Sequence, residues 1–243
     1  MPKPDYTSLD LPEPPGDRPY VLLNMVMSID GKVVIEETEQ GIGSAVDQRL
    51  MRELRVNADI ILNGASTLRK SGSSPRLGGI QELEQIRAER GLTRFPVVAT
   101  LSASGNLPLE RIFFTAGDFQ AVIYLSEVAP EVRRRAIEAT GRSVVTVPRG
   151  GEVPSMLRHM RNELGAKVLL LEGGPTLNAQ FFRENAVDEV FLTVGPVIVG
   201  GSDTITPVEG TPYLRATAPR LDLISAVPLE ESGEVFLRYR VRH

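Results

Sequence analysis

Short apolar runs alternate with amphipathic segments along most of this chain, and that alternation constrains the fold more than any other feature. The runs that we expect to be strands are Tyr20–Met27, Asp59–Asn63, Phe95–Leu101, Ala121–Leu125, Ser143–Val147, Lys167–Leu171 and Val187–Val194. Strands that alternate with helices run parallel and are covered on both faces. The pattern therefore predicts an α/β fold with a mostly parallel central sheet.

The segments between these runs carry helix start and stop signals. Ser44 precedes apolar residues at helical spacing, with Asp47 at the third helical position, which predicts a capped helix that ends near Asn57. Further helices are predicted over Pro130–Thr140, over Pro154–Leu164 and from Pro175 onward. The small-residue turn Gly64–Thr67 could open another helix.

The two ends of the chain depart from the alternation. Leu221–Pro228 and Glu234–Val241 are strand-like with only the turn Leu229–Gly233 between them, which predicts an antiparallel hairpin at the sheet edge. Residues 1–19 are proline-rich, and we expect a tail that lies extended on the surface or is loose in solvent. Residues 20–243 are then expected to form a single domain.

The composition argues against several classes of function. The chain has no cysteine and only two histidines, so it lacks a thiolate nucleophile and a histidine metal cluster, and we predict no metal, although carboxylates alone could still bind one. A formal net charge of −4 with no tryptophan argues against a nucleic-acid-binding surface. Because neither a membrane span nor a signal peptide is evident, we expect a cytoplasmic protein whose partner is a small molecule.

Two glycine pairs follow predicted strands, where a ligand could approach the backbone. Gly173 and Gly174 lie in Glu172-Gly173-Gly174-Pro175-Thr176, between a strand and a helix whose free N-terminal amides would attract a phosphate. For a lone glycine pair, a tight turn with no ligand is the more common reading. Gly200 and Gly201 follow a later apolar segment. Since the loops that follow several parallel strands meet at one sheet edge, together they predict a cleft.

Several charged residues end strands or helices near these loops, namely Asp30, Lys32, Arg55, Arg69, Lys70, Arg76 and Glu172. Each one alone fits a solvated surface charge. Standard dinucleotide and P-loop glycine motifs are absent from the sequence, so a standard Rossmann or P-loop fold is not supported.

Taken in order, five segments resemble the reductase domain of riboflavin biosynthesis. They are Ser28–Lys32, Arg55–Thr67, Pro75–Leu77, Leu171–Thr176 and Gly195–Gly201, and the resemblance spans nearly all of Tyr20–Arg242. It implies a three-layer fold like that of dihydrofolate reductase, NADPH as the hydride donor, and a homodimer. It also implies a reaction in which the ribosylamino group of a pyrimidine 5′-phosphate becomes a ribitylamino group.

The resemblance also assigns roles to residues. The coenzyme would be held by Gly64, Thr67, Gly173, Gly174, Pro175, Thr176, Leu177, Gly200 and Gly201. The substrate would be held by Lys32, Arg55, Arg76, Leu77 and Glu172. Lys32 can donate to a pyrimidine carbonyl, Arg55 can bind a phosphate, and Glu172 can accept from amines or sugar hydroxyls. Lys32, Glu172 and Asp30 are the expected catalytic residues, with the proton coming from Asp30, Glu172 or water.

One departure from the family bears on the substrate. Where the family usually has two aspartates before Pro-Arg-Leu, this chain has Ser73 and Ser74, after an apparent insertion around Ser71-Gly72. One alternative is therefore a related reductase that acts on another pyrimidine or a pterin. A second alternative is a nucleotide-binding module without turnover, against which the presence of Lys32, Arg55 and Glu172 argues.

Overall fold

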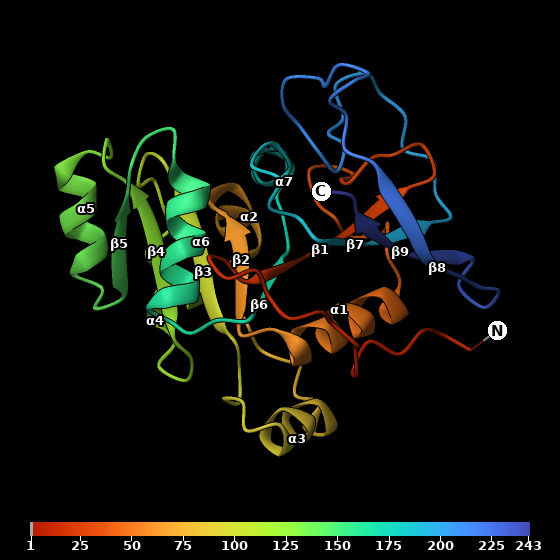
Figure 1. Cartoon of the computed structure of the whole chain (residues 1–243), viewed down its shortest axis with the longest axis horizontal. Helices are drawn as coiled ribbons and strands as arrows, with labels where there is room; N and C mark the ends of the chain where they lie inside the picture. Colours follow the sequence, from red (N-terminus) through yellow and green to blue (C-terminus); the bar gives the residue numbers. More distant parts are fainter. Residues whose placement is uncertain (1) are drawn as a thin grey trace.

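The computed structural model describes residues 2–243, and one nine-stranded sheet runs through it (Figure 1). The strands are β1 (Tyr20–Ser28), β2 (Ile60–Gly64), β3 (Val97–Ser102), β4 (Ala121–Ser126), β5 (Ser143–Val147), β6 (Val168–Leu171), β7 (Glu189–Gly195), β8 (Leu221–Leu229) and β9 (Glu234–Val241). Their order is β5-β4-β3-β2-β6-β1-β7-β9-β8. The pairs from β5 to β7 are parallel, and β9 is antiparallel to both β7 and β8. The predicted parallel sheet with an antiparallel C-terminal hairpin is confirmed.

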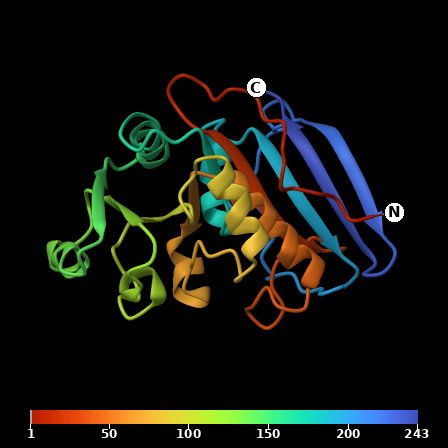
Figure 2. The ribbon, with the colours of Figure 1, turned by 90° about the horizontal axis from the view of Figure 1, so that it is seen from below.

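Helices cover both faces of this sheet, as Figure 2 shows from below. They are α1 (Ala45–Asn57), α2 (Ala65–Ser71), α3 (Gln81–Glu89), α4 (Ile112–Thr115), α5 (Glu131–Glu138), α6 (Glu152–Asn162) and α7 (Pro175–Arg183). Side chains from α1, α3 and α5 are buried on one face, and side chains from α6 and α7 are buried on the other. Neighbouring strand residues point to opposite faces of the sheet. Val98 therefore packs on the face covered by α3 and α5, and Ala99 packs on the face covered by α6 and α7.

The sequence located most elements to within about two residues. The helix predicted over Pro154–Leu164 begins at Glu152 and ends at Asn162, two residues earlier at each end. Pro154 is its third residue, and a proline is tolerated there because the first N–H groups of a helix have no partner within it. The short helices α3 and α4 were not predicted.

Helix α1 is fixed at both ends. The Ser44 hydroxyl accepts from the amides of Val46 and Asp47 at 3.0 and 3.5 Å, which confirms Ser44 as the N-cap. At the other end the buried Arg87 guanidinium donates to the carbonyls of Arg55, Val56 and Ala58. These bonds hold the helix in a fixed position over β6, β1 and β7.

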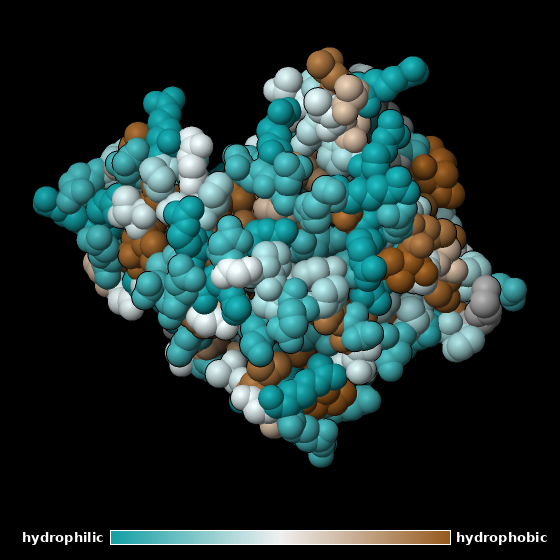
Figure 3. All heavy atoms as spheres, in the orientation of Figure 1, coloured by the Kyte–Doolittle hydropathy of each residue, from teal (hydrophilic) through white to brown (hydrophobic). Residues whose placement is uncertain are grey.

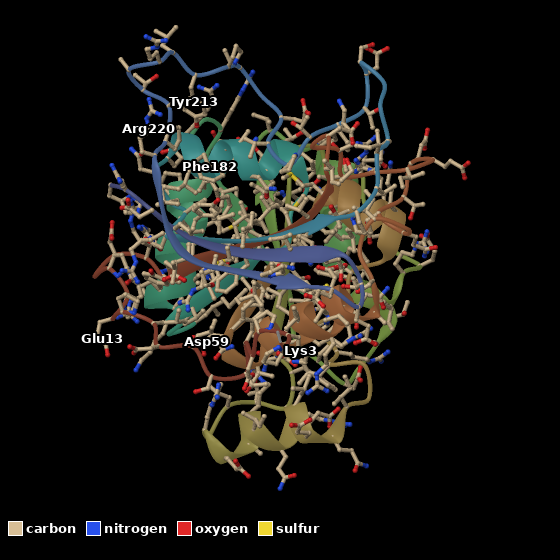
Figure 4. All side chains as sticks on the ribbon, turned by 90° about the vertical axis from the view of Figure 1, so that its right-hand side faces the viewer. Lys3, Glu13, Asp59, Phe182, Tyr213 and Arg220 are labelled. Atoms are coloured by element: carbon tan, nitrogen blue, oxygen red, sulfur yellow. The ribbon has the colours of Figure 1, made fainter. Side chains whose placement is uncertain are left out.

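The described part of the N-terminal tail, residues 2–19, packs on the surface, which was one of the two states expected for it. Tyr6 is 7% exposed, and its ring packs against that of Phe191 in a T-shaped arrangement with 5.0 Å between the ring centroids. The Tyr6 amide donates to Glu53 of α1 at 3.0 Å, and Lys3 pairs with the same carboxylate at 2.8 Å (Lys3 is labelled in Figure 4). Within residues 2–243, no helix is long and apolar enough to cross a membrane.

Candidate active site

The central strand β1 is unexpectedly exposed in its second half. Residues 20–23 are buried, whereas the four residues 24–27 are only half-buried. The neighbouring strand β6 ends at Leu171, opposite Leu23, so beyond that point β1 has only β7 beside it. An opening therefore lies between the end of β1 and the chain that leaves β6.

This opening lies where open α/β sheets bind ligands. β1 continues into α1, which lies on one face, and β6 continues into α7, which lies on the other. The crevice between such diverging connections, at the carboxyl ends of the strands, is the usual ligand site. Figure 3 shows a hollow in the upper edge of the molecule, between the side that carries β3–β5 and the side that carries the 196–220 loop.

The glycine turn after β6 borders the opening. Gly64 at the end of β2 donates its amide to the Gly173 carbonyl at 2.7 Å. A Cβ on Gly64 would lie 3.3 Å from the Gly174 nitrogen, and one on Gly173 would lie 3.2 Å from Met25 Sδ. Gly173 also has a φ of +84°, and the Gly173–Gly174 peptide bond is cis. Because Gly64 and Gly173 have no side chains, the ends of β1 and β2 and the turn after β6 pack closely together here.

Helix α7 starts at this turn, with Pro175 at its first position as predicted. The first-turn amides of Thr176 and Leu177 have no partner within the helix. Asn178, which has no exposed surface, donates to the Pro207 carbonyl at 2.8 Å and so ties α7 to the loop after β7. A Cβ on Gly174 would lie 3.3 Å from the Thr67 hydroxyl, which places Thr67 beside the same turn.

Arg55 and Glu172 form a nearly buried ion pair beside the glycine turn. Arg55 Nε and Nη2 donate to the two Glu172 carboxylate oxygens at 2.7 and 2.8 Å, and the side chains are 11% and 8% exposed. Asn63, at the end of β2, lies 3.5 Å from Glu172 Oε2. The pair connects α1 to the end of β6, and it places a bidentate ion pair at the edge of the opening.

Lys32 and Asp30 lie in the loop after β1. Lys32 Nζ donates to the Thr204 carbonyl at 3.0 Å. The Asp30 carboxylate accepts from the Ser28 hydroxyl and from the amides of Val199 and Gly200 at 2.6, 3.0 and 2.6 Å. These hydrogen bonds, the Ser28 one foremost, lower the pKa of Asp30 to about 2. Asp30 therefore connects the β1 loop to the Gly200-Gly201 loop.

The segment Ser73–Leu77 differs from expectation. The Arg76 side chain pairs with Asp118 at 2.9 Å, with both side chains about two-fifths exposed, and Leu77 has no exposed surface because it packs in the core of α2 and α3. Neither side chain is presented to the opening. The backbone is used instead, since the carbonyls of Ser74 and Arg76 accept from Arg55 Nη1 at 3.0 and 2.8 Å.

Two polar residues at the site were missed from the sequence. Asn63 donates to the Ser73 hydroxyl at 2.9 Å and is 4% exposed, so the serine that departs from the family pattern has a buried partner. Asp47 lies on α1 two turns before Arg55, and burial raises its pKa to about 6. The signal for Asp47 was its spacing, since Asp47, Met51 and Arg55 recur every four residues and share one helix face.

A separate hollow of about 480 Å³ lies away from this site. Phe182, Tyr213 and Arg220, labelled in Figure 4, line it together with the residues that precede β7. It therefore lies near the amino end of β7, whereas the glycine turn, the Arg55–Glu172 pair and Lys32 gather at the carboxyl ends of the strands.

The fold and the position of the site define a class of protein, the α/β proteins with the fold of dihydrofolate reductase. A dihydrofolate reductase from Enterococcus faecalis, solved with NADP(H), shares this fold with a TM-score of 0.51 at 12% identity, over 92% of this chain and 97% of that one. The fold expected from the resemblance is confirmed.

Within that class, the chain belongs to the RibD C-terminal domain family, whose model matches residues 19–232. It is 32% identical to a 2,5-diamino-6-ribosylamino-4(3H)-pyrimidinone 5′-phosphate reductase from Methanothermobacter thermautotrophicus over 226 residues, which are 93% of this chain and 99% of that protein. A pyrimidine reductase-like protein from Corynebacterium diphtheriae has a similar structure, with a TM-score of 0.81 at 22% identity over 93% of each chain.

Proposed function

We propose that this protein is an NADPH-dependent reductase that converts the ribosylamino group of a pyrimidine 5′-phosphate to a ribitylamino group. The observation that carries the proposal is the opening beside β1, which has a side-chain-free glycine turn on one side and a charged Arg55–Glu172 pair at its edge. Family membership supports it, because the archaeal relative is named for a reductase of this substrate class.

The glycine turn fits a dinucleotide. Because Gly64, Gly173 and Gly174 lack side chains, a diphosphate can approach the backbone closely, and the first-turn amides of α7 point their positive dipole toward it. We assign Thr67, Pro175, Thr176 and Leu177 to the same diphosphate-binding site. The Gly200-Gly201 loop, which Asp30 holds in place, closes the opposite side.

The pyrimidine lies, in this proposal, on the α1 side of the opening. One of the three N–H groups of Lys32 binds Thr204, which leaves the others for a ring carbonyl or a sugar oxygen. Arg55 keeps Glu172 in a fixed orientation, so that its remaining lone pairs can accept from an amine or a sugar hydroxyl. For the proposed substrate site we retain the backbone around Arg76 and Leu77 but not their side chains.

Held at Gly64, Gly173 and Gly174, NADPH would supply the hydride that reduces the sugar carbon of the ring-opened imine, and the neighbouring nitrogen would take up a proton to complete the amine. The protein orients both partners and excludes water. Asp30 is a poor proton donor because its pKa is about 2, so we assign it to loop positioning. Of the three proton sources expected from the sequence, Glu172 and water remain.

The test is NADPH oxidation by the purified protein in the presence of the ribosylaminopyrimidine phosphate. We expect turnover with the parent and a loss of about 100-fold or more in kcat/KM for Glu172→Gln, which keeps the shape and removes the charge. Glu184→Gln, an exposed change at the end of α7, is the matched control. A parent protein that binds NADPH and oxidises it with neither this pyrimidine nor a pterin would instead identify the non-catalytic module.

A pterin reductase is a second candidate, favoured by one observation. Ser73 replaces an acidic residue of the family and is engaged by Asn63 at 2.9 Å, so the site has a neutral buried contact at this position. Oxidation of NADPH with dihydrofolate, and none with the ribosylaminopyrimidine phosphate, would establish this alternative.

We also propose a homodimer that forms through β8. This edge strand pairs only with β9, and its residues Leu221, Leu223 and Ile224 are 38%, 57% and 40% exposed. Figure 3 shows hydrophobic side chains on that side of the molecule. Exposed apolar edge strands are templates for association, and a second copy would cover this one.

A further inference from the structure

The hollow near the amino end of β7 is built from three segments that are far apart in the chain. They are the end of α7, the loop before β8 and the end of β9, and Phe182, Arg220 and Val241 represent them in its lining (the first two are labelled in Figure 4). Its volume of about 480 Å³ lies within the range of roughly 300 to 1,000 Å³ that is usual for small-molecule sites. Of the residues that the structure describes, none from β8 lines it, so it is separate from the edge proposed for the dimer.

The deep side of this hollow is apolar. Phe182, Val187 and Val241 are buried members of the core beneath α6 and α7, and Tyr213 packs against the same core from the loop before β8. An apolar surface of this kind favours a ligand whose body is itself apolar, because contact removes both surfaces from water.

The charged side chains that line the hollow are all positive. They are Arg183, Arg220 and Arg242, and no acidic residue of the described chain belongs to the lining. Arg242 is paired, since its Nε donates to both oxygens of Asp222 at 2.9 Å. Within residues 2–243, Arg183 and Arg220 have no carboxylate partner. Two unneutralised guanidiniums at one hollow, in a chain of formal net charge −4, attract an anion.

Arg183 is already held in one orientation. Its Nη2 donates to the Thr211 carbonyl, and its guanidinium carbon lies 5.2 Å from the centroid of the Tyr213 ring, as in a cation–π contact. A guanidinium has five N–H donors, so Nε and Nη1 of Arg183 still have donors for a ligand. The exposed Arg220 side chain donates to no partner in the described part of the chain, and its guanidinium is therefore free to turn toward a bound anion.

We propose that this hollow is a second ligand site, which binds a small organic anion with a flat apolar body. The phosphate or carboxylate of the ligand lies between Arg183 and Arg220, whose planar forks match the oxygens of either group. The apolar body lies against Phe182 and Tyr213. The site goes beyond the proposed reductase function, because it is at the opposite end of α7 from the glycine turn.

The experiment measures the binding of three probes by isothermal titration calorimetry. They are phenyl phosphate, benzoate and inorganic phosphate, so the set separates the charged group from the apolar body. We expect at least one aromatic probe to bind about 10-fold more tightly than inorganic phosphate, because burying the ring adds affinity. The tighter of the two aromatic probes identifies the anionic group that the site prefers.

Two variants locate the binding, and both change exposed positions that line the hollow. Arg220→Gln removes one of the two unpaired charges and should weaken the aromatic probe by about 10-fold. Ala216→Glu adds a negative charge to the lining and should weaken it at least as much, which keeps the test valid if one variant folds poorly. Arg215→Gln removes an exposed arginine of the same loop that does not line the hollow, and it should leave the affinity unchanged.

The possible results bear on the site alone, because the readout is binding and not turnover. An aromatic probe that binds Arg220→Gln and Ala216→Glu as tightly as the parent is bound elsewhere, for example in the catalytic opening, and overturns the proposal. Absence of binding by the parent up to about 10 mM of either aromatic probe overturns it as well. Equal affinity for inorganic phosphate and both aromatic probes would contradict the role of Phe182 and Tyr213.

Discussion

The Arg55 guanidinium connects parts of the chain that are far apart in sequence. It contacts Glu172, 117 residues away, and the carbonyls of Ser74 and Arg76, 19 and 21 residues away. A buried arginine with its N–H groups engaged in this way has one geometry, so it fixes the Glu172 carboxylate as well. The charged edge of the site is therefore a single cooperative unit and not a set of independent surface charges.

Asp47 gives a prediction about stability at the residue scale. Its pKa is about 6 in the folded chain and 3.8 in the unfolded one, so between these pH values the folded state holds the proton more firmly. The carboxyl therefore lowers stability as pH rises from about 4 to 6, by about 2 kcal/mol for a partly buried group, and the penalty persists above that window. Asp47→Asn should remove it.

We expect Asp47→Asn to unfold at a higher temperature than the parent at pH 7.5 and at nearly the same temperature at pH 4. Thermal denaturation followed by circular dichroism at both pH values measures this difference. An equal difference at both pH values would show that burial of the ionised Asp47 carboxylate does not destabilise the folded protein.

Sequence reasoning identified some residues of the site and missed others for definite reasons. Lys32, Arg55 and Glu172 end strands or helices, and they were assigned to the site because the segments that contain them resemble the reductase family. Arg76 and Leu77 were assigned by family position, but whether a side chain turns inward or outward depends on partners such as Asp118 that no local pattern reveals. Asn63 looked like the polar end of an apolar strand, and its contact with Ser73 depends on how the later loop folds back.

At the scale of elements, helix α1 is the one on which the site depends. Ser44 fixes its start, Arg87 fixes its end, and Tyr6 of the tail packs between it and the sheet. The capping residue could be read from the sequence. The contribution of Arg87 could not, because its acceptors lie about 30 residues away in the chain.

The tail gives a second prediction. Tyr6→Ala should destabilise the protein by about 3 kcal/mol, because it empties a site in which the ring packs on Phe191 with 7% exposure. Urea denaturation measures the loss. Tyr6→Phe keeps the ring and should cost well under half as much, whereas an equal cost for both variants would mean that the hydroxyl, and not the packing, holds the tail.

At the scale of the whole molecule, the alternation of strands and helices accounts for the parallel sheet, and the closely spaced final strands account for the hairpin. The strand order was not foreseen, because β1 lies between β6 and β7, which begin at Val168 and Glu189, far along the chain from the end of β1 at Ser28. That order creates the opening beside β1. Periodicity reports which residues are buried and does not report which strands become neighbours.

The exposed edge gives a third prediction. If β8 forms the dimer interface, Leu223→Glu places a charge on the strand edge and should shift the protein from dimer to monomer in sedimentation velocity experiments. Val132→Glu is the matched control, since Val132 is 75% exposed on α5, next to the opposite end of the sheet. A dimer that persists in Leu223→Glu would place the interface elsewhere, and a parent that sediments as a monomer would contradict the proposed dimer.

The proposed reaction is hydride transfer from NADPH to a ribosylaminopyrimidine phosphate bound in the opening beside β1. The most direct measurement is the mass of the product formed with NADPH deuterated at the transferable position of its nicotinamide ring. We expect a ribitylamino product that has gained two hydrogens, one of them deuterium on the sugar carbon, with the parent and not with Glu172→Gln. Recovery of unchanged substrate from the parent, or a reduced product without deuterium, would contradict it.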